Sequence, residues 1–549
     1  MNKKVCTLLL ASFLVLPYFS NAQTPTWQWA KSAGGLLYDA ANSTATDASG
    51  NVYVAGVFES ATVTFGTTTL ANASTDTTDM FLVKYDAAGN VLWAKRAGGT
   101  NFDDATSVTT DASGNVYVTG SFSSSSITFG TTTLTSISLF GTSDIYIVKY
   151  DGAGNVIWAK RAGGNYDDKA TSVATDNLGN VLVTGHFMAD TITFGAISLI
   201  SAGNYDMFVV KYDAAGTALW ANKAGASNDD RGYAVTADAS GNVIVAGSFL
   251  STSITIGTTT LNYAGGAYCD IFLAKYDAAG NVLWAKCAGG TYWDEPNSVV
   301  TDVAGNIYMA GIVYSATIVF GTTTLTNSGN VAYCEMFIVK YDASGNVLWV
   351  DGAGAPSNND IAYSVDLDAT GNVYVVGIYG APITFGTITL TGGGLFIVKY
   401  DASGTVLWAQ GVVGAGGYGV AIDLTGTIYV AGILYGTTTT FGTTTLTNAG
   451  VYDMFVAKLS DVTAIQETEL ELTVSVYPNP SNGIFAVQCD KEIIAIEIYN
   501  IVGESISPLS FRRGAGGEVE FNLSFLTKGV YFVNILTEKG SVSKKIVLQ

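Results

Sequence analysis

The sequence predicts an all-β protein, with a seven-bladed β-propeller over residues 23–460 and a small β-sandwich over residues 474–549. A tryptophan that precedes a short apolar-basic segment recurs at spacings of 64, 65, 62, 64, 65 and 59 residues. A Phe-Gly pair recurs with a similar period, and no stretch has a convincing helical period. Self-similarity of this length is typical of solenoids, propellers and arrays. The seven tryptophans are Trp29, Trp93, Trp158, Trp220, Trp284, Trp349 and Trp408.

Residues 1–22 are expected to form a secretory signal peptide. Lys3 and Lys4 precede an apolar run from Val5 to Val15, and small residues end at Ala22, before Gln23. The run is too short to span a bilayer comfortably, which disfavours a membrane anchor. No later segment has about twenty consecutive apolar residues, so the mature chain is expected to have no transmembrane helix.

Each repeat is expected to contain four antiparallel strands. In the second copy the Asp-x-x-Gly turns at 111–114 and 151–154 each join two runs rich in β-branched and aromatic residues. A Thr-rich excursion at 127–134 separates the two hairpins. The four expected strands are 105–110, 115–120, 144–150 and 155–160.

The ends of the repeat region predict a closed ring. The first copy contributes only a fourth strand, residues 26–31, and the last copy ends on a third strand, residues 453–458. The N-terminal strand can therefore complete the last blade, whereas an open stack would leave two unpaired edges. The strands are also shorter than a membrane β-barrel requires.

Two resemblances add to this interpretation. The runs Asp-x-x-Gly-Asn-Val-Tyr-Val-x-Gly and Val-Lys-Tyr-Asp-x-x-Gly-Asn-Val-Leu-Trp-Ala, over about residues 26–460, resemble the bacterial SBBP β-propeller repeat. That resemblance implies the fold and says little about activity.

The C-terminal end resembles the type A sorting domain of the type IX secretion system of Bacteroidetes. The matching pieces are Pro-Asn-Pro-x-x-Gly from Pro478, a Gly-Val-Tyr strand and the terminal Lys-Lys-Ile-Val-Leu. The resemblance implies the type IX machinery as partner and a secreted or outer-membrane surface-attached product. An ordinary adhesive β-sandwich is the alternative. The acidic residues 461–473 are expected to form a linker.

Composition excludes some partners. The formal net charge of −20 argues against nucleic acid and against anionic lipid. It suits a soluble secreted protein, which we expect to be a monomer, or one that recruits cations. Cys269 and Cys287 lie on two arms of an expected hairpin and could form a disulfide in an extracytoplasmic compartment.

Acidic residues recur on the rim that carries the variable loops. One set lies eight residues before each first-hairpin turn Asp, and a second set begins the third strand of the repeat. These carboxylates could bind Ca²⁺, which prefers several oxygen ligands; alternatively, each accepts backbone hydrogen bonds and joins neighbouring blades. The first set is Asp39, Asp103, Asp168, Asp230, Asp294 and Asp360, and the second is Asp79, Asp144, Asp206, Asp270, Glu335 and Asp453.

The sequence gives little support for catalysis. There is no Gly-x-Ser-x-Gly or His-Glu-x-x-His motif, and the only histidine, His186, is expected to be a packed or solvent-edge residue. The fifth copy is the most altered on the variable rim, with Tyr292, Trp293, Asp294 and Glu295 in succession. These aromatic and acidic side chains could bind a sugar, and they are the expected binding residues.

Three functions follow from these observations. The leading hypothesis is a secreted, non-catalytic module or scaffold that binds glycan or protein through the variable rim. The second is a glycan-active hydrolase or lyase that uses rim carboxylates. The third is a purely structural surface or matrix protein. No cofactor is expected except the possible Ca²⁺.

Overall fold

The computed structural model describes residues 25–138, 141–188, 190–265, 268–328, 331–460, 474–489, 493–500, 505–506, 511–513, 518–537 and 540–549. The chain divides into two compact units, residues 1–462 and 463–549. The predicted signal peptide and linker lie outside the described residues. Within the described ranges, no helix is long and apolar enough to cross a membrane.

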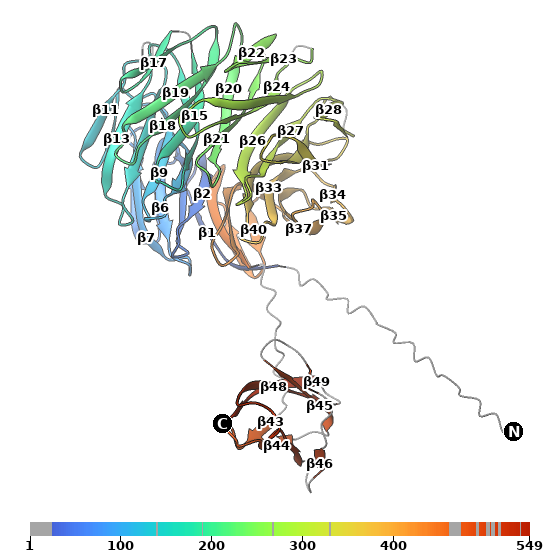
Figure 1. Ribbon diagram of the computed structural model, residues 1–549. Coiled ribbons are helices and arrows are strands. Elements are labelled where there is room, and N and C mark those ends of the chain that lie inside the picture. The colour runs from blue at the N-terminus through green and yellow to red at the C-terminus, as the bar shows by residue number, and fades with distance from the viewer. Residues whose placement is uncertain are drawn as a thin grey trace, which may run out of the picture. The chain divides into compact units, whose positions relative to one another are not determined.

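The first unit consists of four-stranded antiparallel sheets that follow one another along the chain (Figure 1). We number them in chain order. Their first strands are β2 (Asp39–Thr46), β8 (Asp103–Thr110), β14 (Asp168–Thr175), β20 (Asp230–Ala237), β26 (Asp294–Thr301), β32 (Ile361–Leu367) and β38 (Ala415–Ile422). Their second strands are β3 (Val52–Phe58), β9 (Val116–Phe122), β15 (Val181–Met188), β21 (Val243–Phe249), β27 (Ile307–Val313), β33 (Val373–Tyr379) and β39 (Thr427–Leu434).

The first strands of neighbouring sheets contact one another, so they lie nearest the centre of the first unit. The third and outer strands of each sheet lie farther from that centre. The third strands are β6 (Asp79–Tyr85), β12 (Asp144–Tyr150), β18 (Tyr205–Tyr212), β24 (Asp270–Tyr276), β30 (Glu335–Tyr341), β36 (Gly394–Tyr400) and β42 (Asp453–Ser460). The outer strands are β7 (Val91–Ala97), β13 (Val156–Ala162), β19 (Ala218–Ala224), β25 (Val282–Ala288), β31 (Val347–Ala353), β37 (Val406–Val412) and β1 (Thr26–Ala33).

The Thr-rich excursions form hairpins of their own, which the sequence analysis did not predict. Burial alternates along these strands as it does in a strand with one buried face. In β4, Val63 and Phe65 face the core while Thr62 and Thr64 face solvent. The pairs are β4 (Thr62–Phe65) with β5 (Thr68–Ala71), β10 (Ser126–Phe129) with β11 (Thr132–Thr135), β16 (Thr191–Phe194) with β17 (Ile197–Ile200), β22 (Ser253–Ile256) with β23 (Thr259–Asn262), β28 (Thr317–Phe320) with β29 (Thr323–Thr326), β34 (Ile383–Phe385) with β35 (Ile388–Leu390), and β40 (Thr438–Phe441) with β41 (Thr444–Thr447).

The hydrophobic core lies between sheets rather than inside any one of them. The second and third strands are buried along almost their whole length. Because both faces of these strands are covered, their sequences are nearly continuous apolar runs. Each large core cluster combines side chains from two neighbouring sheets: Tyr53 and Leu82 of the first sheet pack with Val118 and Tyr146 of the second. A single sheet would therefore leave both of its faces exposed, and the sheets must associate to bury apolar surface.

The repeated tryptophan joins each sheet to the next. Trp93 Nε1 donates to the carbonyl oxygen of Gly152 at 3.2 Å, and Lys84 Nζ donates to the same oxygen at 3.1 Å. Equivalent Trp and Lys pairs converge on the carbonyls of Ala214, Ala278, Ala343 and Ala402. The marker is repeated because this link is repeated at successive sheet interfaces.

The same link joins the seventh sheet to the first. Trp29 of β1 and Lys458 of β42 both donate to the carbonyl of Ala87 in the first sheet, at 3.2 and 3.0 Å. β1 is the outer strand of the seventh sheet and pairs with β42 from Thr26–Ser460 to Ala33–Met454. The predicted pairing of the N-terminal strand with the last third strand is therefore present.

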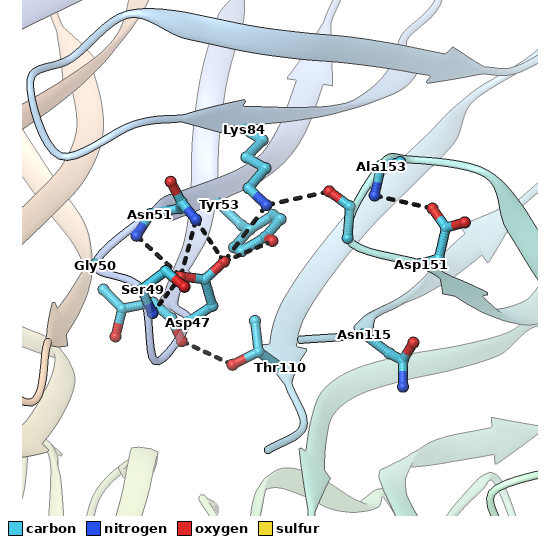
Figure 2. Close-up of polar contacts among 12 residues, drawn as sticks. Asp47, Ser49, Gly50, Asn51, Tyr53, Lys84, Thr110, Asn115, Asp151 and Ala153 are labelled. Carbon is cyan, nitrogen blue, oxygen red and sulfur yellow. Dashed lines mark hydrogen bonds and ion pairs between the residues drawn. The ribbon is translucent and has the colours of Figure 1, made fainter. Parts of the chain in front are cut away.

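Asp-x-x-Gly turns connect the first and second strands of each sheet. Figure 2 shows the turn that begins at Asp47. Asp47 accepts hydrogen bonds from the backbone N–H groups of Ser49 and Asn51, from the Asn51 side chain and from the Tyr53 hydroxyl. Lys84 Nζ lies 3.4 Å from the same carboxylate. Gly50 has φ of 75°, which a side chain would disfavour. This turn therefore combines an Asx turn with an ion pair. Equivalent ion pairs in other sheets are formed by Asp111, Asp176, Asp238 and Asp368.

These turns predict acid sensitivity. Burial alone would raise the pKa of Asp368, but hydrogen bonds from Thr370, Asn372 and Tyr374 lower it to about 2. Aspartate titrates near ~3.9 in an unfolded chain, so this carboxylate contributes stability above about pH 4 that is lost as pH falls through about 2. Asp368→Asn is expected to reduce the fall in Tm between pH 4 and pH 2, measured by calorimetry. An equal fall in variant and wild type would contradict this account.

The second unit contains two antiparallel sheets. One has the order β43 (Val474–Tyr477), β44 (Ile484–Cys489), β47 (Glu518–Asn522), β46 (Phe511–Arg513), and the other has β45 (Ile493–Asn500), β48 (Gly529–Thr537), β49 (Gly540–Leu548). Phe485 and Val487 of the first sheet share a core with Val533 and Ile546 of the second. Asn479 of the Pro-Asn-Pro segment binds the last strand at both ends of its amide: Nδ2 donates to Lys545 O at 2.7 Å, and Oδ1 accepts from Val547 N at 2.9 Å.

Candidate functional site

The first set of rim acids forms buried anchors. We call Asp39, Asp103, Asp168, Asp230, Asp294 and Asp360 the rim aspartates; none is more than 1% exposed. Asp294 accepts hydrogen bonds from Ser315, from Oγ at 2.7 Å and from the backbone N–H at 3.1 Å. Burial raises the pKa of Asp294 to about 7, and the Ser315 hydrogen bonds act in the opposite direction. Ser60, Ser124 and Ser251 make the equivalent bonds in other sheets.

An Ala-Gly-Gly or Ala-Gly-Ala segment before each rim aspartate fits between two acids. Gly99 N–H donates to Asp103 at 2.7 Å, and a Cβ on Gly98 would lie 1.9 Å from Oδ1 of Asp79. Asp79 also forms an ion pair with Arg96, and Asp206 forms one with Lys223. Both sets of acids therefore bind nearby N–H or O–H groups. In the second set, Oδ1 of Asp79, Asp144, Asp206, Asp270 and Asp453 has no hydrogen-bond partner among the described residues. In the described part of the chain, no group of three His, Cys, Asp or Glu side chains is placed to hold a metal ion.

A calcium site and a structural role of these acids predict different changes in Tm when EDTA or Ca²⁺ is added. Because donors already occupy the oxygens of rim aspartates such as Asp294, EDTA is expected to change the Tm by less than about 1 °C, against several degrees for a tightly bound structural ion. Asp294→Ala leaves the buried backbone N–H of Ser315 without its acceptor and removes the shorter of two acceptors from the Ser315 hydroxyl, so it is expected to destabilise the protein by about 1–3 kcal/mol. Thermal melts with EDTA or added Ca²⁺ check both, and a large Tm increase with Ca²⁺ would contradict the structural role.

Residues next to the rim aspartates vary from sheet to sheet. The residue before each anchor is in turn Tyr38, Phe102, Asp167, Asp229, Trp293, Asn359 and, before Ala415 in the last sheet, Gly414. The residue after it is Ala40, Asp104, Lys169, Arg231, Glu295, Ile361 and Gly416. The scaffold thus presents different side chains from equivalent, anchored positions, as binding loops on a rigid frame do.

A pocket lies where these positions of the fourth and fifth sheets meet. It has a volume of about 240 Å³ and is lined by residues that include Arg231, Tyr233, Tyr268, Trp293 and Glu295. A second hollow of about 360 Å³ shares Tyr268, Trp293 and Glu295 and adds Tyr292 and Tyr314. We call the two hollows together the aromatic pocket.

Three rings form its apolar wall. Tyr268 stacks on Tyr292 with centroids 4.7 Å apart and an interplanar angle of 20°, and on Trp293 at 6.2 Å and 29°. Tyr268 and Trp293 are 36% and 44% exposed, so their faces remain partly accessible to a ligand.

Charged groups form the polar wall. Glu295 Oε1 accepts from the Tyr233 hydroxyl at 2.7 Å and lies 3.7 Å from Cys269 Sγ. Burial and the Glu295 charge raise the pKa of Tyr233, so its hydroxyl remains a donor. Arg231 pairs with Asp229 at 2.9 Å and lies over the ring of Tyr205 at 4.7 Å. One guanidinium and two carboxylates leave the pocket with a net negative charge.

The structure brings three of the four predicted binding residues together. Tyr292, Trp293 and Glu295 line the aromatic pocket, whereas Asp294 is buried against Ser315. Sequence analysis did not single out Tyr268, Tyr233, Arg231 or Asp229. Comparing the residues that flank each rim aspartate would have indicated Arg231 and Asp229. Tyr268 follows a loop of variable length, and only the fifth copy has a tyrosine at the equivalent place, Tyr333 two residues before Glu335.

Two other expectations concern Cys and His. The disulfide between Cys269 and Cys287 is not formed: both are free thiols, and Cys287 lies opposite Phe272 because Cys269 precedes β24. His186 is 7% exposed and packs edge-on against Tyr205 at 5.0 Å. Burial lowers its pKa to about 3, so it is neutral at pH 7.

Two segments match known protein families. Residues 157–186 match the family described as Beta-propeller repeat (SBBP), and residues 475–549 match the Secretion system C-terminal sorting domain. The sorting domain indicates secretion and cell-surface attachment and implies interaction with the type IX secretion machinery.

Two curated proteins resemble part of the chain. The chain is 25% identical over 429 residues to the uncharacterised WD repeat-containing protein L264 of Acanthamoeba polyphaga mimivirus, covering 65% of this chain and 31% of that protein. It is 24% identical over 360 residues to the regulatory protein FlaEY of Caulobacter vibrioides, covering 62% and 37%. The chain thus spans about a third of the length of these relatives.

Solved propellers cover most of the chain at low similarity. The WD40 β-propeller domain of Doa1 has a TM-score of 0.39 and 11% identity, covering 81% of this chain and 98% of that one. The Dos1 propeller has a TM-score of 0.37 and 10% identity, covering 80% and 96%. The family matches and the strand order together identify an all-β protein that carries a β-propeller repeat and a C-terminal type IX sorting domain.

Proposed function

We propose that this protein is a secreted, non-catalytic recognition module whose ligand binds the aromatic pocket. The observation that carries the proposal is the contrast between constant anchors and variable neighbours: buried aspartates fix the rim, and one place on it combines accessible aromatic rings with charged groups. Ligand sites are typically concave and aromatic, with a few polar groups.

We infer that the frame behind this site is one closed seven-bladed ring and that the second unit is a β-sandwich. The link from Trp29 and Lys458 to Ala87 supports closure, as does a core cluster that joins Tyr429 and Met454 of the last sheet to Phe81 of the first. The core shared by the two C-terminal sheets supports the sandwich.

A glycan hydrolase is the second candidate, since two carboxylates line the pocket. Asp229 already pairs with Arg231, and Glu295 accepts from Tyr233, so both have structural partners. We therefore expect binding without turnover.

Co-sedimentation of the purified protein with insoluble polysaccharides and with intact bacterial cells tests the proposal. Released reducing sugar is assayed in the same supernatants. Binding without release is the expected result. Sugar release would assign the protein to the hydrolases or lyases. If neither binding nor release is observed, a purely structural role remains.

A further inference from the structure

We propose that the aromatic pocket is a carbohydrate site for an uncharged, pyranose-containing oligosaccharide. This inference rests on the proposed function and specifies its ligand. The two hollows share the wall formed by Tyr268, Trp293 and Glu295, so they form adjoining subsites rather than separate pockets. Adjoining subsites with a common aromatic wall suit a chain of sugar rings.

The aromatic wall has the geometry of a stacking platform. The ring planes of Tyr268 and Trp293 are inclined to each other by only 29°, and Tyr292 stacks on Tyr268 with centroids 4.7 Å apart. Near-parallel rings present a broad apolar face, which fits the C–H face of a pyranose. A quaternary ammonium ligand would instead need rings that enclose it.

The platform is held in position before any ligand binds. Tyr314 N–H donates to the Trp293 carbonyl at 2.8 Å, and the next residue, Asp294, is fixed by Ser315. A fixed backbone reduces the ordering cost of binding. The same backbone contact holds Phe102 in the second sheet, where Ser123 N–H donates to its carbonyl at 2.8 Å.

Polar groups of both signs surround the platform. Within the described residues, both donors to Glu295 reach Oε1, which leaves Oε2 to accept a ligand hydroxyl. Asp229 and Arg231 present an acceptor and a donor side by side. Sugar hydroxyls both donate and accept, so they suit this mixture. The net negative charge of the pocket, together with −20 for the chain, disfavours uronic acids and sulfated sugars.

The test compares matched variants of the full chain by titration calorimetry. The probes are soluble oligosaccharides of β-glucan, mannan, xylan and chitin, with alginate and heparin as anionic probes. At least one neutral probe is expected to bind. Trp293→Ala and Tyr268→Ala are expected to weaken it at least tenfold, and Glu295→Gln several-fold. Phe102→Ala is the control, because Phe102 is 55% exposed at the position equivalent to Trp293, and it is expected to change affinity less than twofold.

Several outcomes would overturn the inference. These are no binding of any neutral probe, preference for the anionic probes, or neutral binding that Phe102→Ala weakens as much as Trp293→Ala. Binding of cells or proteins that Trp293→Ala abolishes, without glycan binding, would retain the recognition function and reject the carbohydrate ligand. Loss of both would reject the proposed function itself. Unchanged Tm values in all four variants ensure that the affinities report the pocket.

Discussion

Deleting residues 25–33 is expected to abolish cooperative folding of the propeller. The deletion removes β1 and leaves β42 as an unpaired edge at the seventh sheet. It also removes Trp27, which packs edge-on against Phe441 at 5.0 Å, and Trp29, which contacts Tyr85 and Tyr429. Trp27 and Trp29 are partly buried, so each contributes less than the ~3–5 kcal/mol that truncating a fully buried tryptophan costs. Together with the lost pairing of β42, the loss of both approaches the lower end of the ~5–15 kcal/mol that stabilises a typical domain. Circular dichroism melts and yield of soluble protein measure the effect.

A circular permutant provides the matched control. Leu459 pairs with Trp27 across the seventh sheet, as Tyr85 pairs with Val91 across the first. Joining Leu459 to Trp27 through Asp-Ala-Ala-Gly-Asn, the turn of residues 86–90, and opening the chain before Gly34 keeps every strand. This permutant is expected to fold with a Tm close to that of the wild type. A deletion variant that melts cooperatively within a few degrees of wild type would show that β1 does not hold the ring closed.

The repeat explains why so much of the fold could be predicted. Each copy contains the same Asp-x-x-Gly turn and the same tryptophan, and six of the seven tryptophans donate to a backbone carbonyl of a neighbouring sheet, so periodicity alone locates strands. The third strand expected at 144–150 agrees with β12 in both bounds. The hairpins of the Thr-rich excursions were harder to predict, because their exposed threonines conceal the buried alternation of residues such as Ile127 and Phe129.

The site could be predicted only in part, because function here depends on departures from the repeat. Trp293 and Glu295 differ visibly from their counterparts in other copies. Tyr268 contributes through a loop whose path no periodicity specifies. Asp294 was misleading for the opposite reason: its recurrence in six copies signals a structural anchor, and the buried bonds to Ser315 agree with that role. The Cys269–Cys287 pairing failed on register, which depends on where a strand begins.

Deleting residues 474–549 is expected to reduce the amount of extracellular protein more than tenfold and to leave the propeller in the periplasm. The matched sorting domain occupies 475–549, and the first unit has its own cores, so the deletion removes the export signal without removing the propeller fold. Immunoblots of culture supernatant, cell surface and periplasm measure the distribution. Fusion of residues 461–549 to an unrelated signal-peptide-bearing protein should export that protein in turn.

Two smaller changes separate folding of this unit from its recognition. Ile546 is fully buried in the shared core, so Ile546→Asp is expected to unfold the unit and block export. Lys544 and Lys545 are exposed on the same strand, and replacing both with alanine should leave the unit folded. Normal export of the Lys544→Ala/Lys545→Ala variant beside failure of Ile546→Asp would show that the machinery reads the folded core rather than these charges. Export of the protein lacking residues 474–549 at the wild-type level would contradict the role of the domain altogether.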